Sequence, residues 1–171
     1  MTRNDELNHA RRLGARGDIA AEEPLSQPPG DSVEQRVAEA GIIRALGDEI
    51  GAHLEPRRIV LIDGTRVEVD GVSDEPAVLV DAWAHQGPPK GAQRNKVLAD
   101  ALKLVLVGGV WANRPRLILC FADAAAARPF TSPARTWYAP ALRECRIEVH
   151  VVSVPKHVRA AIRQAQIRQC R

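Results

Sequence analysis

The stretch RIVLIDGTRVEVDGVSDEPAVLVDAWA, residues 58–84, decides the fold of this chain. Three runs rich in β-branched or alternating apolar residues occupy positions 58–62, 65–72 and 77–84. The first two runs are separated by Asp63-Gly64, a strong signal for a hairpin turn, and the last two by another short turn sequence. Because such short connections join neighbouring antiparallel strands, the stretch predicts a three-stranded meander.

The segments that flank this stretch have helical or strand-like patterns. Apolar residues at helical spacing predict a helix from about residue 31 to 51, and Pro56 marks a break before the first strand. Further helices and strands are expected at 90–107 (ended by Gly108-Gly109), 117–121, 133–145, 147–154 and 156–170. This order, α-β-β-β-α-β-α-β-α, predicts an α/β fold, or α+β by a looser definition. Its centre is a mixed sheet of about five strands flanked by helices.

The composition, 45% apolar and 26% charged over 171 residues, is that of a globular protein. Residues 1–32 are an exception, because they hold few apolar side chains that could offset the entropy lost on ordering. We therefore expect a flexible tail at 1–32 and one domain at 33–171. No apolar run reaches the roughly 18–20 residues of a membrane span, and the polar N-terminus lacks a signal peptide. These features predict a cytoplasmic protein without membrane association.

Charge is distributed unevenly along the chain. The net charge is +3 overall, but it is −2 over residues 1–32 and +5 over residues 141–171. A basic C-terminal segment on an otherwise neutral chain can be a nucleic-acid-binding surface, and it can equally be a solvated helix face. The candidate nucleic-acid-binding residues lie at the start of the second helix and on the last helix: Lys90, Arg94, Arg159 and Arg163.

Two carboxylates on consecutive predicted strands are the residues that indicate a possible metal site. Asp70 lies late in the second strand, and Asp81 follows four apolar residues in the third. If these strands pair, the two side chains can lie side by side, where they would repel each other unless a divalent cation lay between them. Period-2 alternation also places Trp83 on the face of Asp81, toward a cleft beside Asp70. The alternatives are that Asp70 is a turn residue and that Asp81 pairs with Arg66 or Arg94.

The order of elements and the spacing of the two acids resemble the PD-(D/E)XK (restriction-endonuclease-like) nuclease superfamily. The resemblance covers roughly residues 33–122. In that superfamily an Asp follows one strand, and Asp or Glu, any residue and Lys stand on the next. The resemblance implies a Mg²⁺- or Mn²⁺-dependent nuclease acting on DNA, with Asp70, Asp81 and the carbonyl of Ala82 as metal ligands. It also implies a Glu from the first helix, for which Glu34 or Glu39 is available.

The chain departs from that pattern at the lysine position, which Trp83 occupies. In some members the lysine comes from the next helix, where Gln93, Lys96, Asp100 and Lys103 form one polar stripe. Lys96 is the first candidate for a catalytic lysine in that helix, and Lys90 is the second. Trp83 itself can be a wall of the core or a base-stacking platform. His85, just beyond it, can serve as a general base or as a phosphate ligand.

Three functions remain open at this point. The first is a metal-dependent nuclease, or a nuclease-derived protein that processes nucleic acid, with Asp70, Asp81, Lys96 and His85 as catalytic residues and Glu34 as a further metal ligand. The second is a catalytically inactive nuclease-like domain that binds DNA or a protein partner. The third is a homodimeric scaffold that binds no nucleic acid.

Overall fold

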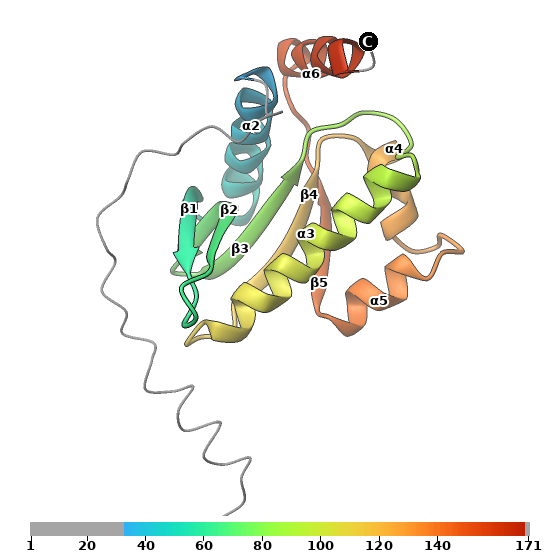
Figure 1. The fold of residues 1–171 in the computed structure, drawn as a ribbon. Coiled ribbons are helices and arrows are strands. Elements are labelled where there is room, and N and C mark those ends of the chain that lie inside the picture. Colours follow the sequence, from blue (N-terminus) through green and yellow to red (C-terminus); the bar gives the residue numbers. More distant parts are fainter. Residues whose placement is uncertain (1–32, 170–171) are drawn as a thin grey trace, which may run out of the picture.

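A five-stranded mixed sheet forms the centre of the computed structural model of this chain (Figure 1), which describes residues 33–169 except the side chains of residues 34, 157, 161, 165 and 167–169. The tail predicted at 1–32 lies outside the described residues. The strands lie in chain order across the sheet: β1 (Glu55–Val60), β2 (Arg66–Asp74), β3 (Ala77–Trp83), β4 (Arg116–Phe121) and β5 (Ile147–Val151). Strands β1 to β3 are an antiparallel meander, and β3, β4 and β5 are parallel neighbours. The expected mixed sheet is thereby confirmed.

Helices cover both faces of the sheet. Helix α2 (Val33–Ile50) and helix α6 (Lys156–Gln169) pack against each other on one face. Helix α3 (Gly91–Val110) crosses the other face, in front of the sheet in Figure 1. The same face is extended by three short elements, α4 (Ala124–Ala127), η1 (Arg128–Phe130) and α5 (Tyr138–Glu144). The long helices thus bury the sheet from both sides, as parallel strands require.

Alternation along β3 divides the interior into two apolar cores. Val78 and Val80 point into the core formed with α2 and α6. Leu79 and Trp83 point into the core formed with α3, and the side chain of Asp81 contacts this same helix. The prediction that Asp81 and Trp83 share a face is therefore confirmed.

Two sequence predictions about proline and glycine are wrong. Pro56 lies inside β1 rather than before it, which an edge strand tolerates because its outer side needs no backbone donor. Helix α3 does not end at Gly108-Gly109 but continues to Val110. A Cβ on Gly108 would lie 2.9 Å from Leu117 Cδ2, so this glycine lets the helix approach β4 closely. The elements expected at 133–145 and 147–154 are shorter, at 138–144 and 147–151.

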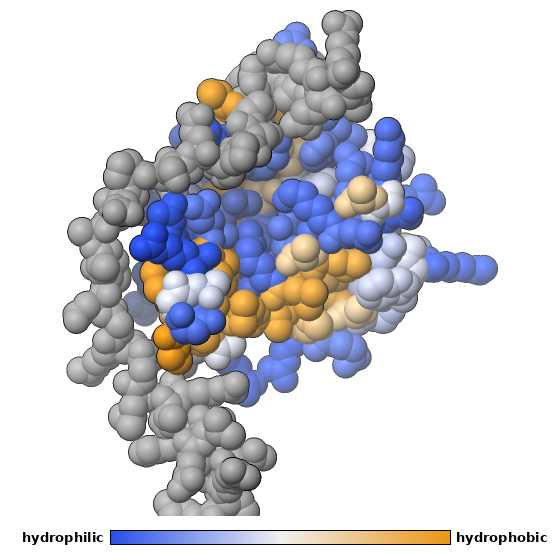
Figure 2. Space-filling view, in the orientation of Figure 1, coloured by the Kyte–Doolittle hydropathy of each residue, from blue (hydrophilic) through white to orange (hydrophobic). Residues whose placement is uncertain are grey.

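The outward side of α3 carries exposed apolar side chains. Leu102 and Leu106 are four residues apart, and Val110 continues the stripe. Figure 2 shows this region as part of an apolar band across the front of the molecule, in the orientation of Figure 1. Among the described residues no helix combines the length and the apolar character needed to cross a membrane. The homodimer stays a prediction.

Candidate active site

One extra residue in β2 creates the local structure around Asp70. Between the pairs Glu55–Val72 and Arg57–Val69, strand β2 holds two residues, Asp70 and Gly71, where β1 holds one. This is the pattern of a β-bulge, which re-aims side chains next to it. Val69 and Val72 both pack in the α3-side core, whereas a Cβ on Gly71 would lie 2.9 Å from Ile43 Cδ1 of α2. Regular alternation along residues 65–72 would place Gly71 on the face of Val69 and Val72 on the other, and the bulge reverses this.

The carboxylate of Asp70 bridges β2 and β3 at the bulge. The register of the two strands ends at Gly71 and Val80, so Asp70 is the next residue along and Asp81 lies opposite it. Asp70 Oδ2 accepts a hydrogen bond from the backbone N–H of Ala82 at 2.9 Å. A side chain thus replaces the main-chain partner that β3 would otherwise have there. The two acids come together across this opening, as the pairing of the strands predicts.

Lys103 of α3 reaches Asp81 across the covered face of the sheet. Its Nζ lies 2.8 Å from Asp81 Oδ1, and the Asp81 side chain is only 3% exposed. The contact is a charge-assisted ion pair on Oδ1, and Asp81 Oδ2 has no hydrogen-bond partner among the described residues. The Lys103 side chain is 28% exposed, so the pair opens toward solvent on the lysine side. Asp81 is covered and does not line an open cleft.

A second ion pair lies next to the first on α3. Lys96 Nζ is 3.1 Å from Asp100 Oδ2, at i,i+4 spacing. Both residues interact electrostatically with Asp70, and Asp100 also does so with Asp81. Three carboxylates and two ammonium groups leave this cluster with one uncompensated negative charge when all are ionised. A proton or a cation would neutralise it.

The pKa values in the cluster follow from burial and from the neighbouring charges. Burial raises the pKa of Asp81 to about 7, against the attraction of Lys103 and with a contribution from the charge of Asp70. Burial likewise raises the pKa of Asp70, although the Ala82 N–H opposes this. Burial alone would lower the pKa of Lys103, but the charges of Asp81, Asp70 and Asp100 outweigh it, and the pKa is raised. Asp81 therefore takes up its proton near neutral pH while Lys103 stays charged.

Lys103 is the site residue that the sequence did not single out. The predicted lysine, Lys96, is bound to Asp100 instead, and neither Arg66 nor Arg94 pairs with Asp81. The signal was present, because Lys103 belongs to the polar stripe of α3 and lies one helical turn beyond Asp100. The sequence does not determine where along β3 helix α3 crosses, and that position decides which lysine of α3 meets Asp81.

Trp83 and His85 lie at the end of β3, where the chain leaves the sheet. The Trp83 side chain is in the core, 5% exposed, and its Nε1 has no hydrogen-bond partner among the described residues. The rings of Trp83 and His85 lie 4.8 Å apart, and Lys96 Nζ is 5.6 Å from the Trp83 ring centroid. Trp83 is thus a wall of the core and is unable to stack on a base while it stays covered.

The predicted nucleic-acid-binding residues gather around the loop 84–90 that follows β3. Gln86 donates to the backbone carbonyl of Arg159, and Arg163 Nε donates to Gln86 Oε1 at 2.8 Å. Lys90 ends the loop, and Arg94 lies in the first turn of α3. Helix α6 and the start of α3 therefore supply one basic rim at the carboxyl end of β3.

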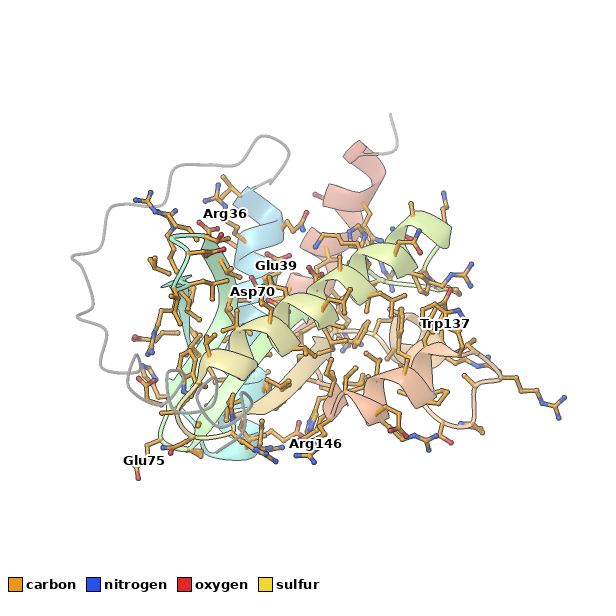
Figure 3. The ribbon with its side chains drawn as sticks, turned by 60° about the horizontal axis from the view of Figure 1, so that its bottom comes forward. Arg36, Glu39, Asp70, Glu75, Trp137 and Arg146 are labelled. Atoms are coloured by element: carbon orange, nitrogen blue, oxygen red, sulfur yellow. The ribbon has the colours of Figure 1, made fainter. Side chains whose placement is uncertain are left out.

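The donors available for a metal are a pair of carboxylates. In the part of the chain that the structure describes, no three His, Cys, Asp or Glu side chains come together as a ligand group. Glu39 of α2 and Asp70 of β2 are close in the projection of Figure 3, but Glu39 does not complete such a group. The side chain of Glu34 lies outside the described residues. Two carboxylates are a donor set that Mg²⁺ could use, because that ion needs only one or two carboxylates and keeps several waters, and Asp81 Oδ2 has no hydrogen-bond partner among the described residues.

A surface groove lies elsewhere on the molecule. It has a volume of about 400 Å³ and runs between α5 and β5, where Phe130, Leu142, Arg143 and Glu148 line it. None of the residues of the charged cluster borders this groove. It therefore plays no part in the chemistry considered for Asp70 and Asp81.

Comparison with known proteins adds no relative. Nothing among the family models, the curated proteins and the solved structures matches this chain. A functional conclusion must therefore come from the residues of the site and from the order of the elements that hold them.

Proposed function

We propose that this protein is a metal-dependent nuclease that hydrolyses phosphodiester bonds of DNA with Mg²⁺ or Mn²⁺. The observation that carries the proposal is the approach of Lys103 Nζ to within 2.8 Å of Asp81 Oδ1, directly across the strand pair from Asp70. Two acids on neighbouring strands and a lysine beside the second are the groups that the PD-(D/E)XK superfamily uses. Here the lysine comes from α3 and Trp83 fills its usual place.

The arrangement of the elements supports this proposal. Helix α2, the meander β1 to β3, helix α3 and strand β4 follow one another in the order α-β-β-β-α-β. The first acid stands in β2 at a bulge and the second in β3, two residues before the end of the strand. A restriction-endonuclease-like fold is therefore part of the proposal.

Asp70 and Asp81 are the residues that would hold the metal. When bound, the ion supplies positive charge to the reacting phosphate and lowers the pKa of a water molecule. The single uncompensated negative charge of the cluster makes a cation favourable there, and Asp81 must lose its proton to bind one. A metal would thereby replace the proton that burial favours on Asp81.

The chain's own residues contribute positive charge and position. Hydrolysis forms a bond between a water oxygen and phosphorus, breaks the bond from phosphorus to the leaving oxygen, and moves a proton to that oxygen. Negative charge develops on the phosphate during this exchange, and the ammonium of Lys103 would stabilise it. Lys103 can act in this way because its pKa is raised by Asp81, so it remains protonated.

The test is a cleavage assay on plasmid and single-stranded DNA with Mg²⁺, Mn²⁺ or EDTA. We expect cleavage that needs metal and that falls on the order of 10³-fold in Asp81→Asn and in Lys103→Met. Lys156→Met and Glu148→Gln remove the same charges outside the cluster and serve as matched controls. Cleavage that survives Asp81→Asn would show that the site is elsewhere.

A second candidate function is an inactive nuclease-like domain that binds DNA. The observation in its favour is that Asp81 is covered and already paired with Lys103, so this carboxylate has a countercharge without a metal. This candidate predicts DNA binding by the basic rim, Lys90, Arg94, Arg159 and Arg163, with no cleavage under any metal condition. Gel-shift and cleavage measurements on the same preparation separate the two candidates.

A further inference from the structure

Helix α3 has a second uncharged face, on the side turned away from the sheet. The face toward the sheet is formed by the buried residues Val97, Ala101, Leu104 and Val107. The opposite side is a line of six exposed residues, which we call the α3 seam: Ala92, Asn95, Ala99, Leu102, Leu106 and Gly109. Leu102 is 67% exposed and Leu106 is 54% exposed, within the apolar band that Figure 2 shows at the front of the molecule.

The charged residues of α3 all lie off this seam. They are Arg94, Lys96, Asp100 and Lys103. Lys96 pairs with Asp100 and Lys103 pairs with Asp81, so three of these four charges are engaged within the chain itself. An amphipathic helix normally turns its charged side to water, whereas α3 turns an uncharged line of about five turns to it. Such a line is the surface that a second helix covers when it packs alongside.

The order of large and small side chains makes the seam complementary to a copy of itself. We consider two α3 helices that run antiparallel about a two-fold axis passing between residues 100 and 101. The facing pairs are then Ala92 with Gly109, Asn95 with Leu106, and Ala99 with Leu102 of the second copy. Each leucine thus meets a smaller side chain, so the two seams fit closely along their whole length. A parallel pair would stack each leucine on its own counterpart and leave the alanines apart.

The charges at the two ends of α3 also favour an antiparallel pair. Lys90 and Arg94 lie at the start of the helix, whose first turn has no acidic residue, and the last turn has no basic residue. The helix dipole adds positive charge at the start and negative charge at the end. An antiparallel pair places each positive end beside the negative end of the other copy, whereas a parallel pair would bring the two positive ends together.

We propose that the α3 seam is the interface of a homodimer, in which two copies pack their α3 helices antiparallel about a two-fold axis. The same surface is used by both copies, so the contact closes at two. A helix of 20 residues is about 30 Å long, and one helix pair covers less than the roughly 800 Å² per partner of a standard interface. We therefore expect a reversible dimer with a micromolar Kd. The proposal involves no metal and no nucleic acid, so it stands or falls independently of the proposed function.

The first experiment is sedimentation velocity on the full chain from about 1 to 300 µM, the range in which a micromolar Kd is measured. We expect the sedimentation coefficient to rise from that of a monomer to that of a dimer and to level off there. A chain that stays monomeric at the highest concentration would overturn the proposal, because the seam would then face solvent or a different molecule. Growth beyond the dimer would contradict the two-fold contact.

Matched variants locate the interface. Leu102→Glu brings a carboxylate from each copy close to the two-fold axis and should raise the Kd at least about 100-fold. Leu and Glu have similar helix propensities and the position is exposed, so circular dichroism should show an unchanged fold. Val37→Glu adds the same charge on α2, where Val37 is 58% exposed, and should leave the Kd unchanged. Equal weakening by both variants, or none by Leu102→Glu, would place the contact elsewhere.

Spin labels distinguish the antiparallel from the parallel pair. Gly91→Cys carries the label, because a Cβ there meets no atom within 4 Å, in a background of Cys145→Ser and Cys170→Ser. Cys120 is buried and is not labelled. In the antiparallel dimer the two labels should be about 30 Å apart, from 19 residues at about 1.5 Å each. Electron paramagnetic resonance measures this distance, and a value near the interaxial spacing of about 10 Å would overturn the antiparallel arrangement.

Discussion

Asp81 of β3 and Lys103 of α3 face each other with 2.8 Å between Oδ1 and Nζ, in a position where only 3% of the Asp81 side chain is exposed. This contact ties the longest helix of the described chain to the strand at the centre of the sheet. It also brings a positive charge to two acids that burial would otherwise keep protonated.

Replacing Lys103 should lower the free energy of unfolding, because the buried carboxylate of Asp81 loses its positive partner. We expect Lys103→Met to lower the free energy of unfolding by up to about 3–5 kcal/mol at pH 8, because without the lysine Asp81 must either stay charged without a partner or hold a proton that it would release in the unfolded chain. The loss should be smaller at pH 6, where Asp81 can take up a proton. Urea denaturation at both pH values measures it. The matched control is Lys96→Met, whose exposed ion pair with Asp100 is worth at most about 1 kcal/mol.

The raised pKa of Asp81 makes stability depend on pH in a defined direction. Between its ordinary pKa of 3.8 and its folded pKa of about 7, the folded state binds more protons than the unfolded state. The free energy of unfolding should therefore fall as the pH rises through this window. The lowered pKa of His85 acts in the opposite direction. Because His85 is present in both proteins, the difference between wild type and Asp81→Asn reports on Asp81 together with its effect on the raised pKa of Asp70, and a flat difference would contradict the assignment.

The hydrogen bond from Ala82 to Asp70 can be tested with a pair of variants. Asp70→Ala leaves the Ala82 N–H without its acceptor and should destabilise the fold by about 1–3 kcal/mol. Asp70→Asn keeps an oxygen acceptor and should be clearly more stable than Asp70→Ala. Thermal denaturation of both variants gives the comparison. Equal stability would mean that only the charge of Asp70 matters.

The two glycines near the end of α3 should respond differently to alanine. Gly109→Ala adds a methyl group where no atom lies within 4 Å, and it should stabilise the helix by about 0.5–1 kcal/mol. Gly108→Ala places a Cβ 2.9 Å from Leu117 Cδ2 and should gain nothing or lose stability. If both variants gain equally by chemical denaturation, the close approach of α3 to β4 is not as described.

The pattern of the sequence was sufficient for the order of the strands and the long helices and for the pairing of the meander, but it did not predict the short elements α4 and η1. Alternation along residues 77–83 also assigned the faces of Asp81 and Trp83 correctly, because β3 is regular. The same rule failed in β2, where the extra residue at Asp70-Gly71 moves Val72 onto the face of Val69. An insertion in one strand is visible only against its partner strand, so a rule for single strands misses it.

The prediction that Lys96 is the lysine beside the two acids was wrong for a related reason. Lys96 and Lys103 lie on one stripe of α3, and the spacing within a helix gives no preference between them. Which lysine meets Asp81 depends on how the helix is placed along β3, and that placement is set by packing such as the contact of Gly108 with Leu117. The contact of His85 Nδ1 with Gln166 Nε2, 81 residues away in the chain, likewise lies outside any local pattern.

The bulge in β2 shows that this strand is one residue longer than its hydrophobic interior requires. If Gly71 were deleted, Val67, Val69 and Val72 would alternate regularly and keep the face they have now. Asp70 would then take the place of Gly71 opposite Val80, and its carboxylate would turn from Ala82 toward Ile43 on α2. The chain could thus shorten by one residue without changing which apolar side chains the sheet buries on this face, while the acid would be carried to the opposite side. Chain length in β2 therefore controls the chemistry of the site separately from the architecture that contains it.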